Sequence, residues 1–288
     1  MAEYKNQHYV PQHYLSRWAI ISNPNKKNER LPFILDKSTN NIKQKNIKNL
    51  FSESYFYDVK KLTDPETKQL RDYFYKKIPI VNSGKEVKDS DIKEIIDKGM
   101  LSLSLCVERA DKNISIEKFF FSQIEAGYKV IGDIIDKGEH VKNILDENLV
   151  NLQLYIAFLF SRTKFFRAHL PEIYKDIGVV TDNPDKFFPY LLLIDTFLES
   201  SFFHQYYTKI SLKNTRKPLI TSDNPVIWRK DYIVLPISPW KYLKFAKDSC
   251  CSDAILYDDD KFLNYCQYNQ ADKYLIAATK EDFDFLII

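Results

Sequence analysis

The chain has 288 residues, of which 44% are hydrophobic and 15% aromatic, and its 42 basic and 39 acidic side chains leave a formal net charge of +3. This composition supports a large core, and the length fits one large domain because single hydrophobic cores stop growing at about 250–300 residues. The small net charge excludes a global field that would draw the protein onto nucleic acid, and the six glycines form neither a Walker motif nor a dinucleotide-binding fingerprint.

The first 60 residues predict an arm, a helix and a β-hairpin. Pro11 fixes its own φ and favours extended backbone before it, so residues 7–10 should form a strand-like arm and Pro11 should open a helix. Residues 31–36 and 42–47 are expected to pair as two strands around a polar turn. Pro32 indicates that the first of these strands lies at a sheet edge.

Residues 61–210 predict a helical region. Asp64, followed by Pro65 and Glu66, is the expected N-cap of a helix that runs towards residue 77. Helical periods continue over residues 89–109 and 115–136, and residues 145–167 and 185–204 are two further candidate helices. The middle of the segment 145–167 is almost entirely apolar, so it predicts a central helix that is buried on several sides.

Residues 211–288 predict a β-rich region. Short strands are expected at 219–221, 226–228, 232–235, 274–278 and 283–288, with one helix at 258–271. Nothing resembles a linker. The sequence therefore predicts a single domain, 1–288, of the α+β class, with a mainly helical core and small antiparallel β elements from the N-terminal and C-terminal regions.

The cysteines and the apolar runs indicate the compartment. Cys250 and Cys251 are adjacent and Cys106 and Cys266 stand alone, so no pair has the spacing of a zinc knuckle and all four are expected to be reduced thiols. The N-terminus lacks the basic-then-apolar pattern of a signal peptide, and no apolar run approaches the roughly 20 residues that span a bilayer. We therefore expect a cytoplasmic protein without a membrane partner.

Three separated motifs stand out: NQHYVPQHYLSRW at residues 6–18, TSDNPVIW at residues 221–228 and LPISPW at residues 235–240. In this order they resemble the uncharacterised bacterial family 4238 of domains of unknown function. The resemblance implies that residues 51–57, 124–125, 162–167 and 264–271 are family positions as well, and these include Glu125, Arg162 and Asn264. It implies no activity.

The N-terminal motif offers an anion-binding site. His8 and His13 are five residues apart with a proline between them, so they do not form a zinc pair on one helix. The free N–H groups of the helix start, with the side chains of Gln7, His8, Gln12 and Arg17 nearby, would suit a phosphate or a carboxylate. Alternatively, Gln7 and His8 hydrogen-bond to buried backbone and hold the arm in place.

The segment Ser222-Asp223-Asn224 is a second candidate cluster. Short polar side chains before a proline are typical of a turn, in which they bond to nearby backbone, and this would explain each residue type. The family resemblance implies a further role for Asp223, as a general base or as a carboxylate that orients His8. Both interpretations remain open from the sequence.

Charges within apolar helical patterns form the third cluster. Glu125 and Arg162 each lie among hydrophobic residues and are expected to pair, because buried charges are rarely unpaired. The pair either fixes how two helices dock or presents Arg162 as a phosphate clamp. Arg162 and His169 also resemble, by loose spacing on one helix, the catalytic pair of HEPN ribonucleases. Asn264 would complete a polar cleft or simply be solvated.

Between residues 20 and 50 there are seven Lys or Arg and two acidic residues. This excess of positive charge is either a solvated hairpin or a phosphate-facing surface.

Together these observations favour a hydrolase or transferase that acts on a phosphodiester, with a nuclease as one example and nucleic acid as the partner. His8, Asp223 and Glu125 are the candidate catalytic residues, and a divalent metal ion is a candidate cofactor with no assigned ligand set. The candidate binding residues are Gln7, Gln12, Arg17, Arg162, Ser222, Asn224 and Asn264. The alternative is a non-enzymatic binding module for an anionic ligand, nucleic acid or a protein partner. The oligomeric state is left open.

Overall fold

The computed structural model describes residues 6–21, 30–54, 59–81, 88–107, 122–137, 141–177, 184–247 and 260–286. The chain forms two compact units: unit 1 comprises Met1–Gln7, Glu53–Arg162 and Phe166–Gln205, and unit 2 comprises His8–Ser52, Thr163–Phe165 and Tyr206–Ile288. The predicted helical region therefore falls almost entirely in unit 1, whereas unit 2 combines β elements from both ends of the chain. The fold is α+β and mainly helical, as the sequence predicts.

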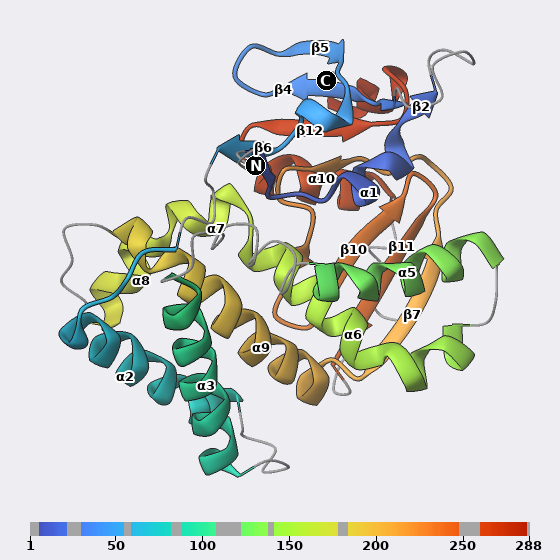
Figure 1. Cartoon of the computed structure of the whole chain (residues 1–288). Coiled ribbons are helices and arrows are strands. Elements are labelled where there is room, and N and C mark those ends of the chain that lie inside the picture. The colour runs from blue at the N-terminus through green and yellow to red at the C-terminus, as the bar shows by residue number, and fades with distance from the viewer. Residues whose placement is uncertain are drawn as a thin grey trace. The chain divides into compact units, whose positions relative to one another are not determined.

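Unit 1 is built from helices (Figure 1). They are α2 (Asp64–Val81), α3 (Asp89–Val107), α5 (Ser122–Lys137), α6 (Val141–Ser161), α7 (Lys164–Ala168), which starts in unit 2, α8 (Leu170–Ile177) and α9 (Phe188–Tyr206), with a 3-10 turn η4 (Pro184–Lys186) before α9. The predicted helix 145–167 thus ends at Ser161 and is followed by the separate short helix α7. The first part of the predicted helix 115–136 lies outside the described residues.

The centre of unit 1 is apolar. Helix α9 is hydrophobic around most of its circumference and is buried over most of its length, as expected of a helix surrounded by others. Helices α5 and α6 approach closely at Gly127, where an added Cβ atom would lie 2.6 Å from the carbonyl oxygen of Asn151. A larger residue at position 127 would therefore push these two helices apart.

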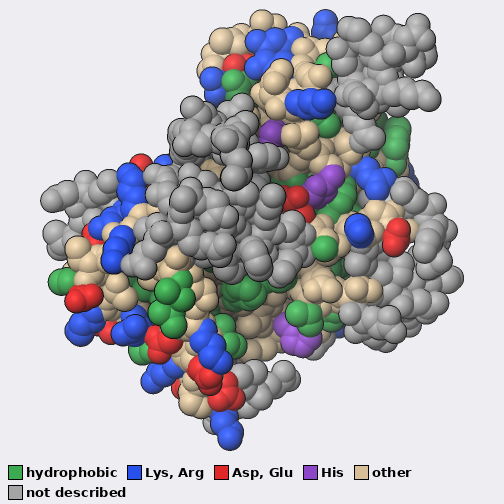
Figure 2. Space-filling model, in the orientation of Figure 1, with side chains coloured by type: hydrophobic (Ala, Val, Ile, Leu, Met, Phe, Trp, Pro, Cys, Tyr) green, Lys and Arg blue, Asp and Glu red, His purple; other side chains and the backbone are tan. Residues whose placement is uncertain are grey.

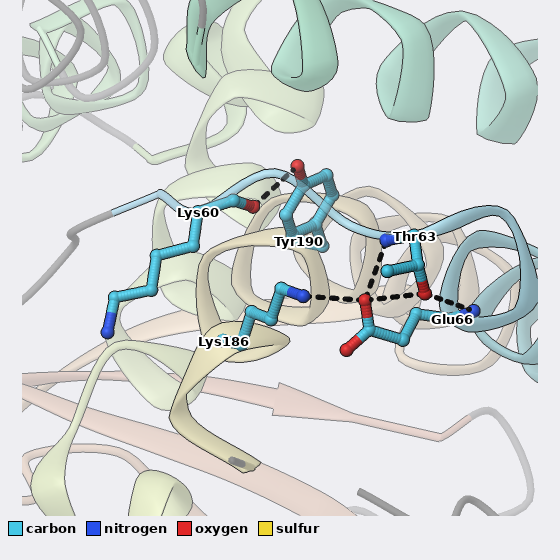
Figure 3. Close-up of polar contacts among 5 residues, drawn as sticks. All are labelled: Lys60, Thr63, Glu66, Lys186 and Tyr190. Carbon is cyan, nitrogen blue, oxygen red and sulfur yellow. Dashed lines mark hydrogen bonds and ion pairs between the residues drawn. The ribbon is translucent and has the colours of Figure 1, made fainter.

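The N-terminus of α2 corrects the predicted cap. Thr63, rather than Asp64, makes the capping contacts: the Thr63 N–H donates to Glu66 Oε2 at 2.6 Å, and the Glu66 N–H donates to Thr63 Oγ1 at 3.4 Å (Figure 3). Lys186 Nζ lies 2.6 Å from the same Glu66 oxygen and so joins the turn before α9 to α2. Burial opposes ionisation of Glu66, but the Lys186 ammonium and the Thr63 donors hold its pKa below the ordinary value.

Unit 2 contains two antiparallel four-stranded sheets. In the first, the order is β7 (Lys209–Asn214), β11 (Lys241–Ala246), β10 (Tyr232–Ser238) and β9 (Ile227–Trp228); in the second, it is β5 (Asn41–Gln44), β4 (Phe33–Asp36), β12 (Tyr274–Ala277) and β8 (Thr221–Ser222). Two-stranded sheets pair β1 (Asn6–His8) with β6 (Ser52–Ser54) and β2 (Ile20–Ile21) with β3 (Arg30–Leu31). The predicted hairpin 31–47 is the β4–β5 pair.

Helix α10 (Asp260–Gln270) lies between the two sheets of unit 2 (Figure 1). Its residues Leu263 and Cys266 pack with Val234 and Tyr242 of the first sheet, and Tyr268 packs against a second cluster that includes Leu275. Helix α10 thus packs against both cores of unit 2.

The N-terminal motif forms the short helix α1 (Gln12–Leu15) and the 3-10 turn η1 (Ser16–Trp18). A second 3-10 turn, η2 (Ile47–Asn49), follows strand β5.

Three β predictions were wrong or incomplete. Strand β4 lies between β5 and β12 rather than at an edge. Pro32 precedes the strand, so its missing N–H removes no hydrogen bond from the sheet. Residues 283–286 of the predicted strand 283–288 instead belong to a 3-10 turn η5 (Glu281–Leu286), and residues 287–288 lie outside the described residues. The turn is favoured by the Asp282 carboxylate, which accepts the Thr279 N–H at 2.9 Å. Strands β7 and β11 were not predicted, because lysines interrupt their apolar pattern.

Among the described residues, no helix combines the length and the hydrophobicity needed to cross a membrane.

Candidate functional site

A stripe of polar side chains on α10 holds the extended segment that contains the second motif. The Asp260 carboxylate accepts the backbone N–H groups of Arg216 and Lys217 at 2.8 and 2.7 Å. One turn further along the helix, Asn264 accepts the Ile220 N–H and donates to the Pro218 carbonyl, both at 2.9 Å. The side chains therefore satisfy backbone groups that a neighbouring strand would otherwise satisfy.

The same stripe continues to the motif itself. Gln267 accepts a hydrogen bond from Ser222 Oγ at 2.8 Å and donates to the Pro225 carbonyl at 2.7 Å. Gln270 Nε2 donates to the Asn224 carbonyl at 2.6 Å. The polar side chains of α10 lie three or four residues apart, so they share one face of the helix. This signal was visible in the sequence, but the pairing of the stripe with an extended segment was not.

Asp223 is the one carboxylate of the second motif, residues 221–228. Only 3% of the residue is exposed, and its two oxygens accept the backbone N–H groups of Asp272 at 3.0 Å, Lys273 at 2.8 Å and Tyr274 at 3.0 Å. Burial raises the pKa of Asp223 to about 6, and the three N–H donors oppose that rise. The carboxylate thereby fixes the turn that joins α10 to β12.

Two aromatic residues of the N-terminal motif hydrogen-bond to the second and third motifs and to the residues just before them. The buried Tyr14 hydroxyl lies 2.8 Å from Thr221 Oγ1 and donates to the Pro236 carbonyl at 2.7 Å. Trp18, four residues later, donates its indole N–H to the Leu219 carbonyl at 3.0 Å. The three motifs that carry the resemblance therefore meet in the core of unit 2.

The predicted site residues of these motifs separate into two groups. Ser222, Asp223, Asn224 and Asn264 are buried, and their side chains hydrogen-bond to nearby backbone and to α10. The turn interpretation accounts for these contacts. The second group, on the N-terminal arm, is nearer the surface.

His8 belongs to the second group. It is partly buried, its Nε2 lies 3.2 Å from the Lys48 carbonyl oxygen, and Gln12 Nε2 lies 3.0 Å from the same ring nitrogen. Arg17 is partly exposed on η1, whereas Gln7 is fully buried and belongs to unit 1. The imidazole is thus held by a backbone carbonyl and by the predicted binding residue Gln12.

A row of aromatic rings begins at Tyr9, the residue that follows His8. Tyr9 and Phe51 have ring centroids 5.8 Å apart, and Phe51 lies 6.0 Å from Tyr274. The ammonium groups of Lys45 and Lys273 lie 5.2 and 5.1 Å from the Tyr274 ring centroid. Phe51 adopts a positive φ of 51°, which is unusual for a bulky residue, and its carbonyl accepts the Tyr9 N–H at 2.8 Å.

Lys164 extends this surface, because its Nζ lies 5.3 Å from the ring centroid of Tyr9. Lys48, whose carbonyl contacts His8, is the remaining lysine of the set. We call the set Lys45, Lys48, Lys164, Lys273, Tyr9 and Tyr274 the lysine face. Lys and Arg side chains gather over the part of unit 2 that contains β4 and β5 (Figure 2). Of the charged residues between Phe33 and Leu50, four are lysines and one is aspartate. The local charge is therefore positive although the whole chain is nearly neutral.

In unit 1 the expected pair of Glu125 and Arg162 is present. Arg162 Nη1 lies 3.0 Å from Glu125 Oε1, and the exposed fractions of the two side chains are 1% and 28%. The guanidinium also lies over the Phe158 ring, 4.3 Å from its centroid. Glu125 and Arg162 belong to unit 1, whereas His8 and Asp223 belong to unit 2. A cleft shared by all four residues remains a prediction.

The HEPN-like spacing is not supported by the helices. Arg162 follows the last residue of α6, and His169 lies in the turn between α7 and α8. The two side chains therefore do not project from one continuous helix, which that spacing requires.

A further polar cluster in unit 1 was not predicted. Lys77 Nζ of α2 lies 2.7 Å from Asp195 Oδ1 of α9, and Ser161 Oγ donates to Glu199 Oε2 at 2.9 Å. Two acidic residues four apart within the otherwise apolar run of α9 are the signal that would have identified it.

The fold and these contacts define an α+β protein whose named motifs stabilise its own core. A family model described as "Protein of unknown function (DUF4238)" matches residues 6–186, and the chain belongs to this family. The second and third motifs lie beyond the matched residues. No curated protein and no solved structure matches the chain.

Proposed function

We propose that this protein binds nucleic acid through the lysine face of unit 2. The observation that carries the proposal is the placement of two ammonium groups, those of Lys45 and Lys273, about the ring of the partly exposed Tyr274. Lysines neutralise phosphates, and an aromatic ring offers a surface on which a base stacks without regard to its identity. The combination favours a polyanion that also carries aromatic bases.

The neighbouring carboxylate of Asp36 is held mainly by Ser38. Asp36 lies opposite Tyr274 in the β4–β12 register, and its Oδ1 accepts hydrogen bonds from the Ser38 N–H at 3.0 Å and the Ser38 hydroxyl at 2.5 Å. The Ser38 contacts hold the pKa of Asp36 below its ordinary value and turn its negative charge towards the β4–β5 turn. Asp36 and Asp272 also attract the Lys273 ammonium, and the four lysines of the face outnumber these two carboxylates.

Hydrolysis of a bound phosphodiester is the second candidate, and His8 favours it. An imidazole is the side chain whose ordinary pKa lies nearest neutral pH, so it can both accept and donate a proton in one reaction cycle. His8 contacts the backbone of Lys48, a member of the lysine face, and Gln12 contacts the ring. Since Asp223 already accepts three backbone N–H groups, the proposal assigns acid–base chemistry to His8 and structural support to Asp223.

The binding test compares two matched double variants by fluorescence anisotropy with labelled single-stranded RNA and double-stranded DNA over a range of salt concentrations. Lys45→Ala/Lys273→Ala should weaken binding and reduce the slope of log Kd against log salt by about 2, one for each phosphate contact. Lys209→Ala/Lys213→Ala removes the same charge from exposed positions of β7 and should leave both quantities unchanged. Equal losses in the two variants would contradict a specific face.

The cleavage test uses the same nucleic acids with and without Mg²⁺ or Mn²⁺. Hydrolysis at this arm is supported if the wild type cleaves, His8→Ala does not cleave and His13→Ala still does. The melting temperature of His8→Ala should equal that of the wild type. If the wild type binds but cleaves none of the substrates, the protein is a binding module, which is the alternative that the sequence left open.

A further inference from the structure

Helix α9 carries two carboxylates in a hydrophobic environment. Asp195 and Glu199 are four residues apart and therefore lie on one face of the helix, one turn from each other. Asp195 is only 1% exposed, and Glu199 is partly buried. Carboxylates are seldom placed in such a position unless their charge is compensated.

The compensation that the contacts supply is incomplete. Lys77 Nζ lies 2.7 Å from Asp195 Oδ1 and 4.5 Å from the Tyr73 ring centroid. The second Asp195 oxygen, Oδ2, has no hydrogen-bond partner among the described residues. Glu199 accepts a hydrogen bond from the hydroxyl of Ser161 at 2.9 Å. Within the described part of unit 1, two carboxylates thus face one ammonium group, and one negative charge remains to be neutralised.

The titratable neighbours identify the group that takes up a proton. Burial raises the pKa values of Tyr73 on α2 and Tyr174 on α8, so both phenols stay neutral. Burial disfavours the charged form of Lys77, but the adjacent Asp195 outweighs burial and raises the pKa of Lys77, which stays protonated. Burial first, and then the charge of Asp195, raise the pKa of Glu199 to about 8. Glu199 is therefore the group that is protonated at neutral pH.

We propose that Lys77, Asp195, Glu199 and Ser161 form a proton-controlled latch between helices α2, α6 and α9. With the proton bound, the neutral Glu199 carboxyl stays against Ser161 in the helix interface. When the proton leaves, the second carboxylate charge is repelled by Asp195 and is better solvated by water, so Glu199 turns outward and the contact with Ser161 opens.

The position of Ser161 gives the latch a consequence for the chain. Ser161 is the last residue of α6, and Arg162, which pairs with Glu125, follows directly. The next three residues, Thr163–Phe165, belong to unit 2. The latch thus acts one residue before Arg162, the last residue of unit 1 on this stretch of the chain.

The direction of the pH dependence follows from linkage. The ordinary pKa of a glutamate is 4.5, and that of Glu199 in the folded protein is about 8. The folded state therefore binds the proton more tightly than the unfolded or opened state. The stabilisation is fully present below pH 4.5 and is lost as the pH rises towards about 8.

Two measurements on the full chain test the latch. In the first, ¹³C NMR of side-chain-labelled glutamate follows the Glu199 carboxyl, assigned with Glu199→Gln, between pH 4 and pH 10. In the second, amide hydrogen exchange of the last turn of α6 is compared at pH 6 and pH 9, after correction for the intrinsic pH dependence of exchange. Glu94→Gln, at an exposed i,i+4 pair with Lys98 on α3, is the matched control.

The expected result is titration of Glu199 near pH 8 and wild-type protection that falls on the order of tenfold per pH unit as the pH approaches that value. Glu199→Gln should remove this dependence, and Glu94→Gln should retain it. The latch is overturned if the Glu199 carboxyl titrates below pH 6, a result that wild-type protein alone can give even if the glutamine variant does not fold. It is also overturned if Mg²⁺ or Ca²⁺, rather than a proton, restores protection at pH 9, since the carboxylates would then form a metal site.

Discussion

Substitution of Asp223 by alanine should unfold unit 2 at a clearly lower temperature. The change leaves three backbone N–H groups, those of residues 272–274, without their acceptor. An unsatisfied buried donor costs about 1–3 kcal/mol, and the low end applies because water reaches part of this turn. For three donors the expected loss is therefore about 3 kcal/mol. For a domain of this size that corresponds to roughly 10 °C in melting temperature.

Tryptophan fluorescence is the assay of choice, because Trp18, Trp228 and Trp240 are the three tryptophans of the chain and all lie in unit 2. Thermal and urea unfolding followed at this emission report on unit 2 separately from the helices of unit 1. The exposed neighbour Asp272 provides the matched control. Asp272→Asn should change the free energy of unfolding by less than about 0.5 kcal/mol.

Asp223→Asn should have a milder effect than Asp223→Ala. The amide keeps the shape of the carboxylate and one acceptor oxygen, but its NH2 group faces at least one of the three backbone N–H groups. We expect a loss of about 1–3 kcal/mol for this variant. The structural role of Asp223 is refuted if both Asp223 variants melt within about 1 °C of the wild type. If they also lose nucleic-acid binding or cleavage while remaining folded, Asp223 belongs to a functional site after all.

Three further predictions concern other contacts. Tyr14→Phe removes two buried hydrogen bonds and should cost about 1–3 kcal/mol in urea unfolding followed by tryptophan fluorescence. Arg162→Met leaves Glu125 without its cation and should cost about 2–3 kcal/mol by far-UV circular dichroism, whereas Arg167→Met, at a pair with an exposed carboxylate, should cost less than about 1 kcal/mol. Burial raises the pKa of Asp223 from 3.8 to about 6, so wild-type stability should fall as the pH rises between these values, and Asp223→Asn should show no such slope in unfolding measured across that range.

The helices of unit 1 illustrate what a local pattern specifies. Apolar residues at helical spacing predict α3 and α5, because the period of a helix is the same wherever the helix packs. The Glu125–Arg162 pair was predictable for a related reason: a charge inside an apolar helix face must find an opposite charge. In both cases the required information lies within one segment, or in one general rule about burial.

The TSDNP motif shows where local patterns fail. Its residue types fit both a turn and a reactive site, and the sequence does not distinguish them. The contacts that give Ser222, Asp223 and Asn224 their structural role come from α10 and from the turn before β12, more than 40 residues later in the chain. Only the tertiary fold brings these donors and acceptors together.

The sequence by itself determined the α+β class, the helical middle of the chain, the Glu125–Arg162 pair and the positive charge of the β4–β5 hairpin. The tertiary structure decided that β4 is an interior strand, that Lys45 and Lys273 flank one tyrosine ring, and that Lys77 faces the carboxylates of α9. The physical reason is the range of the interactions. Hydrophobic periodicity and backbone restraints act within a few residues, whereas hydrogen bonds and charge pairs join whatever side chains the packed elements place within about 3 Å of each other.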